Sequence, residues 1–227
     1  MTMAGRRPGG WDPDRTTLSE ISSILMQAYP TARGLEKFML QWRPYICPFQ
    51  EIVGRVPHDV TVLDVGCGIG IMPVLLSARG CTTRLIGMDV STRAIRVAQG
   101  ARYPDGVTVD FRWCPPDGAW PSEQFGAVVC VDVVHHVPAR HQQAFITRLV
   151  SACAPGGTLI IKDIAPTPWW KAAANTLHDL VMSRQWAHYR AEQILLDWLR
   201  QEGTEVVEHT RLDRLWYSHV VMVARKR

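Results

Sequence analysis

Apolar stretches alternate with helix-like stretches from about residue 60 to residue 164. Four of the apolar stretches, VTVLDVG, RLIGMDVS, FGAVVCVDV and TLIIKDI, are nearly continuous. Between them, segments such as IMPVLLSARG and STRAIRVAQGARY have the apolar spacing of helices. A strand without a polar face must be covered on both sides, as in a parallel sheet flanked by helices. The alternation therefore predicts an α/β fold with a mostly parallel sheet and helices on both faces.

The two ends of the chain depart from this alternation. Residues 17–29 and 34–56 have apolar residues every three or four positions, interrupted by prolines, which predicts short helices. We therefore expect an N-terminal helical cap over residues 1–55, and a main domain over residues 56–227. Near the other end, the connection between TEVVEHTRL and YSHVVMVAR is so short that the two strands must be antiparallel neighbours. Residues 165–190 lie between the fifth strand and this hairpin and are predicted to form an inserted lid.

Composition limits the class of protein. The chain has 227 residues, of which 47% are hydrophobic and 20% charged, as expected for one globular domain. It contains no uninterrupted apolar run of the roughly 18 residues that a membrane span needs. The six cysteines form no C-x-x-C pair, and several lie in apolar stretches, which favours reduced thiols and a cytoplasmic location. The net charge of +4 is spread along the chain and neither requires nor excludes an anionic partner.

The stretch VLDVGCGIG, residues 62–70, joins the first predicted strand to a helix. Its three glycines remove Cβ atoms at the sheet edge where α/β folds bind ligands, so a ligand can lie against the backbone. The spacing differs from G-x-G-x-x-G, because Ile71 stands where the third glycine would be, and Met72-Pro73 excludes a Walker-type phosphate loop. Asp64 would repel a pyrophosphate but suits a ligand that carries an ammonium and a sulfonium. Asp89 ends the second strand, from where a carboxylate can accept both hydrogen bonds of a ribose diol.

Four motifs in order resemble those of the class I S-adenosylmethionine-dependent methyltransferases of the small-molecule type: VLDVGCGIG, GMDVS, FGAVVCVDVVHHV and CAPGGTLIIKD. The resemblance covers about residues 55–225. It implies a Rossmann-like, seven-stranded, mostly parallel sheet with an antiparallel final strand, and S-adenosyl-L-methionine as cofactor. By the same resemblance the three glycines pack against the methionine moiety of the cofactor. Asp64 orients its amino group, Asp89 holds the ribose and Asp132 lines its amino end.

One position departs from the family pattern. Many members have an aspartate after the third strand that meets the adenine amine, whereas this chain has Cys114 followed by Pro115. The backbone near Cys114 or the indole of Trp113 is left to recognise adenine. The predicted cofactor-binding residues are Asp64, Gly66, Cys67, Gly68, Gly70, Asp89, Val90, Cys114, Pro115 and Asp132.

The candidate catalytic residues follow the fourth and fifth strands. His135 and His136 lie on the same predicted sheet edge as the glycine turn, and imidazole is the natural base for a hydroxyl acceptor. Asp163 ends the fifth strand on that edge and could orient a histidine or bind the acceptor; the structural alternative for all three is packing or helix capping. Lys162 should point to the opposite face by strand alternation. No metal site is expected, because only Asp132 and Asp163 accompany the histidines.

The acceptor is predicted to be a small hydrophobic or aromatic molecule. Nine tryptophans are present, and Trp169, Trp170 and Trp186 fall within the predicted lid. Methylation of oxygen is favoured, with nitrogen and carbon acceptors left open. The alternatives are an RNA or other nucleic-acid methyltransferase, which the absence of an N/D-P-P-Y/F motif disfavours, and a non-catalytic cofactor-binding protein. A nucleic-acid partner is not expected, and a homodimer is among the oligomeric states that the sequence allows.

Overall fold

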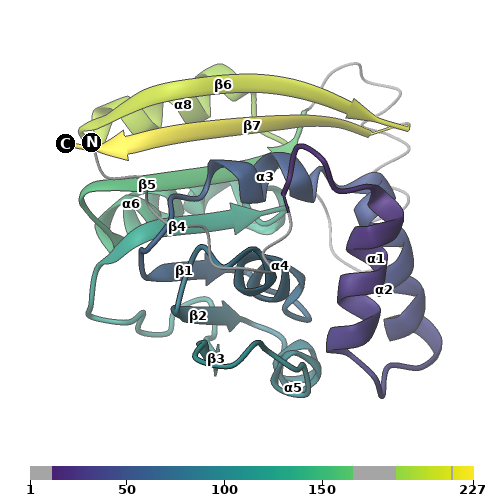
Figure 1. Ribbon diagram of the computed structural model, residues 1–227. Helices are drawn as coiled ribbons and strands as arrows, with labels where there is room; N and C mark the ends of the chain where they lie inside the picture. Colours follow the sequence, from purple (N-terminus) through teal and green to yellow (C-terminus); the bar gives the residue numbers. More distant parts are fainter. Residues whose placement is uncertain (1–11, 166–187, 216) are drawn as a thin grey trace, which may run out of the picture.

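The computed structural model describes residues 12–165, 188–215 and 217–227, in which a seven-stranded sheet has the order β3-β2-β1-β4-β5-β7-β6 (Figure 1). The strands are β1 (Val62–Val65), β2 (Arg84–Asp89), β3 (Thr108–Trp113), β4 (Phe125–Val131), β5 (Cys153–Ile164), β6 (Thr204–Arg214) and β7 (Tyr217–Lys226). Strands β1 to β5 are parallel to their neighbours, while β7 pairs antiparallel with both β5 and β6. The predicted fold, with its antiparallel final strand, is confirmed.

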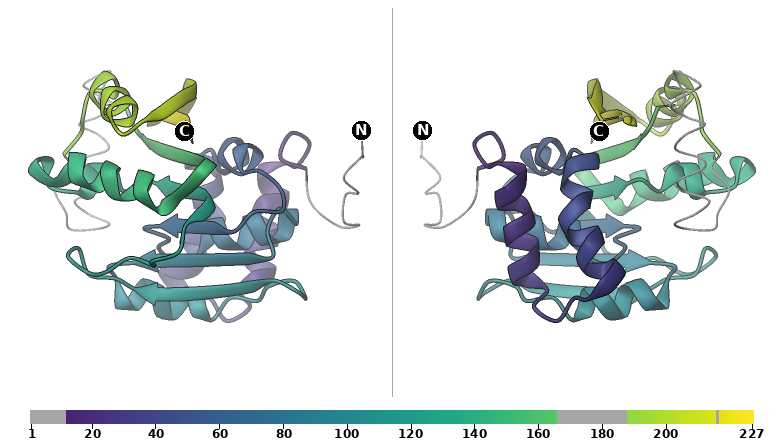
Figure 2. Two further views of the ribbon diagram at one scale, coloured as in Figure 1. Left: turned by 90° about the vertical axis from the view of Figure 1, so that its left-hand side faces the viewer. Right: turned by 90° about the vertical axis from the view of Figure 1, so that its right-hand side faces the viewer.

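Helices cover both faces of this sheet, as predicted from the continuous apolar strands. Figure 2 shows α1 and α2 on one side of the sheet and α6 and α8 on the other. The helices are α1 (Leu18–Ala28), α2 (Gly34–Ile46), α3 (Phe49–Arg55), α4 (Ile71–Arg79), α5 (Thr92–Gln99), α6 (Gln142–Ala152) and α8 (Glu192–Gln201). A membrane-spanning helix would need a longer apolar stretch than any helix of the described residues provides.

The N-terminal helices share the core of the sheet. Thr17 caps α1 through a capping box with Glu20, which fixes the start of this helix. Leu25 of α1 and Leu40 of α2 are fully buried and belong to one cluster with Val62 and the other strand residues of that face. Figure 1 shows α1 and α2 beside the carboxyl ends of the parallel strands. The cap therefore closes the sheet edge that carries the candidate site; the division at residue 55 stays a prediction.

Two details differ from the expected pattern. Strand β5 begins at Cys153 and not at Thr158, because Cys153 already pairs with Phe125 before a register shift in the ladder. Residues 114–124, which connect β3 to β4, contain no helix. This connection is held by Arg148 of α6, which donates hydrogen bonds of 3.1 and 2.6 Å to the carbonyls of Pro116 and Gly118. The apolar side chains that would face a crossover helix are thus covered by a loop.

A matched pair of substitutions on α2 tests this shared core. We expect Leu40→Ala to lower the free energy of unfolding by about 2 to 5 kcal/mol, because Leu40 is fully buried. Leu35→Ala should change it by less than about 0.5 kcal/mol, because Leu35 is 50% exposed on the same helix. Urea denaturation of both variants measures the difference. Equal and small effects would show that the cap does not share the core.

Candidate functional site

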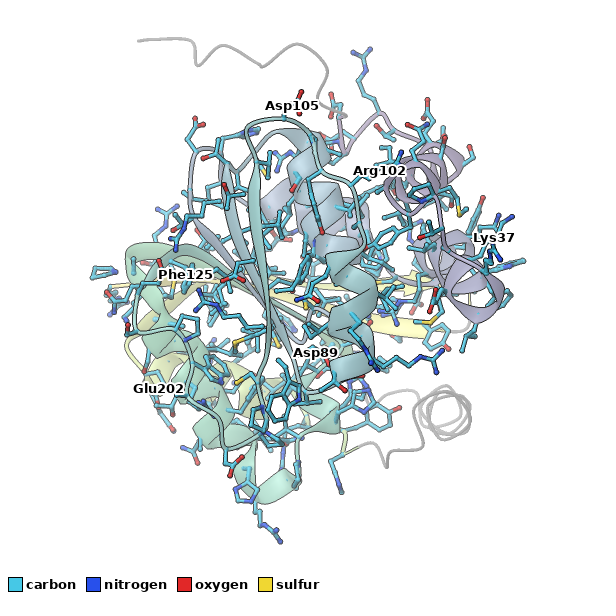
Figure 3. The ribbon with its side chains drawn as sticks, turned by 90° about the horizontal axis from the view of Figure 1, so that it is seen from below. Lys37, Asp89, Arg102, Asp105, Phe125 and Glu202 are labelled. Atoms are coloured by element: carbon cyan, nitrogen blue, oxygen red, sulfur yellow. The ribbon has the colours of Figure 1, made fainter. Side chains whose placement is uncertain are left out.

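A cavity of about 1030 Å³ lies along the carboxyl ends of the parallel strands. Its walls come from the turns after β1, β2, β3 and β4, the end of β5, helices α2 and α6, and the start of β7. Figure 3 views the molecule from the β3 side, with Asp89 at the end of β2 near α5 and Phe125 at the opposite end of the sheet. This is the edge at which open α/β sheets bind their ligands.

The glycine turn has three left-handed residues with different surroundings. A Cβ on Gly66 (φ 74°) would lie 2.3 Å from Cγ2 of Val133, so this glycine allows the turns after β1 and β4 to touch. A Cβ on Gly68 (φ 54°) would meet no atom within 4 Å, and both glycines line the cavity. Gly70 (φ 86°) instead faces the Tyr29 hydroxyl oxygen, which would lie 2.9 Å from a Cβ at this position, and Gly70 is not part of the cavity wall. Gly70 thus packs against Tyr29 behind the turn, and the expected contact of all three glycines with the cofactor stays a prediction.

Cys67 does not line the cavity either. Its side chain packs with Ile95, Ala98 and Phe111 in a small cluster beneath α5. A buried thiol of this kind acts as a small apolar side chain. Cys67 therefore supports the turn from behind, and its expected contact with the cofactor stays a prediction.

Asp89 joins the glycine turn to the end of β2. One carboxylate oxygen of Asp89 accepts a 2.8 Å hydrogen bond from the backbone N–H of Gly68, and the other accepts one of 2.8 Å from the backbone N–H of Ser91. Asp89 and the following Val90 line the cavity, as predicted. The Asp89 carboxylate therefore fixes two turns and stands at the cavity wall.

The end of β3 lies beside Asp89. Cys114 and Pro115 line the cavity, and the backbone N–H of Cys114 donates a 2.9 Å hydrogen bond to the Asp89 carbonyl. The indole Nε1 of Trp113 donates to the Val90 carbonyl at 2.9 Å, so it is already engaged with the backbone. Of the two predicted candidates for recognising adenine, the Cys114 region is therefore the one at the wall.

Asp64 is buried below the glycine turn. It is only 1% exposed, it is not part of the cavity wall, and its Oδ2 atom has no hydrogen-bond partner. Burial, with a smaller contribution from the charge of Asp89, raises the pKa of the Asp64 carboxyl to about 8. The Oδ2 atom of Asp64 can therefore accept a hydrogen bond from a bound ligand, and the carboxyl group can interact with a positive charge on that ligand.

His135 and Asp163 form a buried pair on the α6 face of the sheet. His135 Nδ1 contacts the Asp163 carboxylate, which also accepts hydrogen bonds from the backbone N–H groups of His135 (3.1 Å) and Ile164 (2.8 Å). Because a carboxylate only accepts, Nδ1 carries the proton and Nε2 is the basic nitrogen of the neutral ring. His135 lines the cavity, whereas Asp163 is 3% exposed behind it. Asp163 thus contacts the histidine from behind and is not part of the cavity wall, so its expected catalytic role stays a prediction.

His136 also lines the cavity, and its ring centroid lies 4.1 Å from that of His135. The ring of Tyr189 stacks on the other side of His135 with a centroid distance of 5.7 Å. The segment that carries Tyr189 is tied to the His135 turn by a 2.6 Å hydrogen bond from the His188 N–H to the His135 carbonyl. The buried Gln142 side chain donates to the His188 carbonyl at 2.7 Å and to the Val134 carbonyl at 3.0 Å.

These contacts give His188 and Tyr189 a structural role beside the histidine pair. The three tryptophans of the predicted lid, Trp169, Trp170 and Trp186, lie outside the described residues. The lid itself therefore stays a prediction.

Asp132 and Lys162 meet on the opposite face of the sheet. The Lys162 ammonium contacts Asp132 Oδ1, and Arg43 of α2 donates to Asp132 Oδ2 at 3.3 Å. Although burial alone would raise the pKa of the Asp132 carboxyl, Lys162 and Arg43 hold it well below its usual value. Asp132 has a left-handed φ of 57°, a conformation unusual outside glycine. Asp132, Lys162 and Arg43 all line the cavity.

Lys162 and Asp163 point to opposite faces of the sheet, as predicted from strand alternation. The cavity also extends over the Lys162 face, between β5 and α2, which was not predicted. Arg43, Trp120, Phe145, Arg148, Tyr217 and His219 also line the cavity and were missed. The missed residues come from α2, the β3–β4 connection, α6 and β7, which carry none of the four motifs. The four motifs fix only the strand ends, so nothing in the sequence indicated which neighbouring side chains would reach them.

No group of three or more His, Cys, Asp or Glu side chains with a metal-binding arrangement occurs within the part of the chain that the structure describes. The six cysteines are buried and unpaired.

Comparison with known protein families shows which family the chain belongs to. A family model described as a methyltransferase domain matches residues 29–209, which include every strand from β1 to β5. The chain belongs to the class I S-adenosylmethionine-dependent methyltransferases. This methyltransferase is 31% identical over 176 residues to a ubiquinone biosynthesis O-methyltransferase of Leptothrix cholodnii, covering 71% of this chain and 70% of that protein.

Other relatives of this methyltransferase match over shorter stretches. The enzyme of the same name from Pseudomonas fluorescens is 32% identical over 109 residues, covering 47% of this chain and only 45% of that protein. Among solved structures, the magnesium protoporphyrin IX methyltransferase of Synechocystis with bound SAH has a TM-score of 0.63 and 19% identity, with 90% and 93% of the two chains covered. A SAM-dependent methyltransferase of Methanosarcina mazei has a TM-score of 0.58 and 21% identity, with 75% and 94% covered. These structural matches confirm the fold.

The raised pKa of Asp64 predicts how stability depends on pH. The folded protein keeps a proton on Asp64 up to about pH 8, whereas an unfolded chain releases it near pH 4. The free energy of unfolding therefore falls as the pH rises from about 4 to about 8. We expect Asp64→Asn, which cannot ionise, to become more stable relative to the unsubstituted protein between pH 5 and pH 9, by on the order of a few kcal/mol.

Thermal denaturation at several pH values measures this difference. Asp110→Asn is the matched control, because Asp110 is exposed on β3 and paired with Arg112. A stability difference that does not change with pH would contradict the assignment for Asp64.

Proposed function

We propose that this methyltransferase transfers a methyl group to an oxygen atom of a small, partly apolar acceptor, with His135 as the base and Asp163 as its orienting partner. The observation that carries the proposal is the His135–Asp163 pair, because His135 and the glycine turn line the same cavity. A hydroxyl acceptor must lose its proton as it attacks, and imidazole titrates in the range where such a base operates. The similarity to O-methyltransferases of ubiquinone biosynthesis supports an oxygen acceptor.

The residues at the glycine turn fit the donor of this family. Gly68 leaves open space in front of the turn, where a side chain would otherwise project into the cavity. The carboxylate of Asp89 stands at the wall and can accept hydrogen bonds from a ribose diol. The unpartnered Oδ2 of Asp64 suits an amino group, directly or through water. When bound, S-adenosylmethionine supplies a methyl group on a positively charged sulfur, which keeps the electron pair of the broken bond.

The protein then has to move one proton. His135 Nδ1 is held by Asp163, so Nε2 can take the proton of the acceptor hydroxyl while the oxygen forms its bond to the methyl carbon. The Asp163 carboxylate stabilises the imidazolium that results, as buried carboxylates do for catalytic histidines. The stacked ring of Tyr189 and the hydrogen bond from His188 hold the turn that carries the base. The reaction otherwise depends on holding the two reactants in line.

The cavity suits a small acceptor in addition to the donor. Its volume of about 1030 Å³ lies at the upper end of the range for small-molecule pockets. Ile46, Val133 and Phe145 give it apolar walls, and Trp120 packs edge-on against Phe145 with ring centroids 5.8 Å apart. Apolar and aromatic walls with a few polar groups are typical of small-molecule sites.

Substitution of Asp89 tests the donor site. We expect Asp89→Ala to weaken binding of S-adenosylhomocysteine by about 1.5 to 3 kcal/mol, because a charged hydrogen-bond acceptor is lost. Isothermal titration calorimetry measures the affinity. Asp110→Ala is the matched control on the neighbouring strand β3, where the side chain is exposed and outside the cavity. Unchanged affinity in Asp89→Ala, with the fold intact, would remove Asp89 from the donor site.

Substitution of the histidines tests the base. We expect His135→Ala to lower kcat by about 100-fold or more and to abolish its fall at acidic pH, while the affinity for S-adenosylhomocysteine stays within about twofold. The measurements are pH–rate profiles and calorimetric titrations. His58→Ala, which alters an exposed loop residue, is the control. If only His136→Ala produces this loss, the base is His136 and the role given to the His135–Asp163 pair is wrong.

A further inference from the structure

A second polar cluster lines the cavity on the sheet face opposite to His135 and Asp163. It consists of Lys162, His219, Asp132 and Arg43. Ile164 pairs with His219 and Lys162 pairs with Val221 in the antiparallel ladder of β5 and β7. Lys162 and His219 are therefore diagonal neighbours on one face, within reach of a single ligand group. Lys162 is 1% exposed and His219 is 2% exposed.

His219 presents a hydrogen-bond acceptor that the protein leaves unused. Its Nε2 contacts the Ile46 carbonyl at 2.7 Å, and because a carbonyl only accepts, Nε2 carries the proton. Nδ1 is then the acceptor nitrogen of the neutral ring, and it has no hydrogen-bond partner. Burial, reinforced by the nearby Lys162 ammonium, lowers the pKa of His219 to about 3, so the ring stays neutral at physiological pH. A buried polar atom without a partner is uncommon and calls for a ligand or a water.

Lys162 presents hydrogen-bond donors. An ammonium group has three N–H donors, and within residues 12–165, 188–215 and 217–227 the partner of Lys162 is Asp132 alone. The carboxylate of Asp132 is shared with Arg43, so two cations surround one anion. The cluster can therefore donate further hydrogen bonds to an oxygen atom of a bound molecule.

We propose that Lys162 and His219 bind a hydroxyl group of the acceptor other than the one that is methylated. This inference rests on the proposed function. A hydroxyl is the group that both accepts from an ammonium and donates to an imidazole nitrogen. A carboxylate does not fit, because its lone pairs would face the lone pair of His219 Nδ1. An ammonium does not fit, because the positive charge of Lys162 would repel it. The proton stays on this hydroxyl, because Lys162 and Arg43 disfavour a charged His219 beside them.

The acceptor class follows from the two clusters. The hydroxyl that loses its proton faces the His135–Asp163 pair on one side of the sheet edge, and the hydroxyl that keeps its proton is held by Lys162 and His219 on the other. The acceptor is therefore a small molecule with at least two hydroxyl groups on an apolar frame, and the second hydroxyl sets its orientation and its affinity.

Binding of naphthalene probes in the presence of saturating S-adenosylhomocysteine tests this inference without turnover. We expect the protein to bind at least one of 2,3-, 1,5- and 2,7-dihydroxynaphthalene about tenfold more tightly than 2-naphthol, as measured by fluorescence titration. His219→Phe and Lys162→Met should each remove this preference. His209→Phe is the matched control on β6, because His209 pairs with Glu192 outside the cavity.

The outcomes separate the two proposals. If no diol is preferred by the unsubstituted protein, or if the preference survives both substitutions, the inference is wrong although the proposed function stands. If S-adenosylhomocysteine does not bind the unsubstituted protein, the proposed function falls first. Should thermal denaturation show that His219→Phe does not fold, the probe series on the unsubstituted protein and on Lys162→Met decides the question.

Discussion

The close approach of two turns, one after β1 and one after β4, shapes the whole functional edge of this protein. Gly66 makes the approach feasible, since any Cβ there would overlap Val133. Asp89 then draws the same β1 turn towards β2 through its hydrogen bond from Gly68. The three strand ends thus meet around one cavity, and every polar group discussed above is placed relative to this junction. Packing at this density leaves little freedom for the turns to move independently.

Two different clusters of polar side chains lie on the two faces of the sheet at this edge. On the α6 face, the Asp163 carboxylate accepts hydrogen bonds from two backbone N–H groups and contacts the His135 ring. On the face of α2, the charge of Asp132 is offset by two cations, and His219 is neutral beside them. Because consecutive residues of β5 point to opposite faces, Lys162 and Asp163 supply one group to each side. A single dipeptide thus serves both walls of the cavity.

Much of the fold was predictable, and the reasons differ between elements. The buried strands were found because their apolar runs are continuous, and the β6–β7 hairpin because its connection is short. The start of β5 was not found, because Pro155 and two glycines resemble a stop signal, whereas Cys153 before them already pairs with Phe125 of β4. Within the site, the strand end that carries Asp89 does line the cavity, as its position in the sequence indicated. The packing of Gly70 against Tyr29 was not predictable, because a glycine can be required beside a ligand or beside a packed ring, and the sequence does not distinguish these cases.

The sequence by itself determined the mostly parallel α/β fold, the family, and the sheet edge along which the cavity lies, because these depend on local periodicity and on four short motifs. Tertiary structure alone decided which side chains face the cavity from other elements. Arg43 is 89 residues from its partner Asp132, and His219 is 173 residues from the Ile46 carbonyl that sets its tautomer. Such contacts depend on how helices and strands pack against each other, and no local pattern encodes that packing. The second polar cluster therefore became visible only in three dimensions.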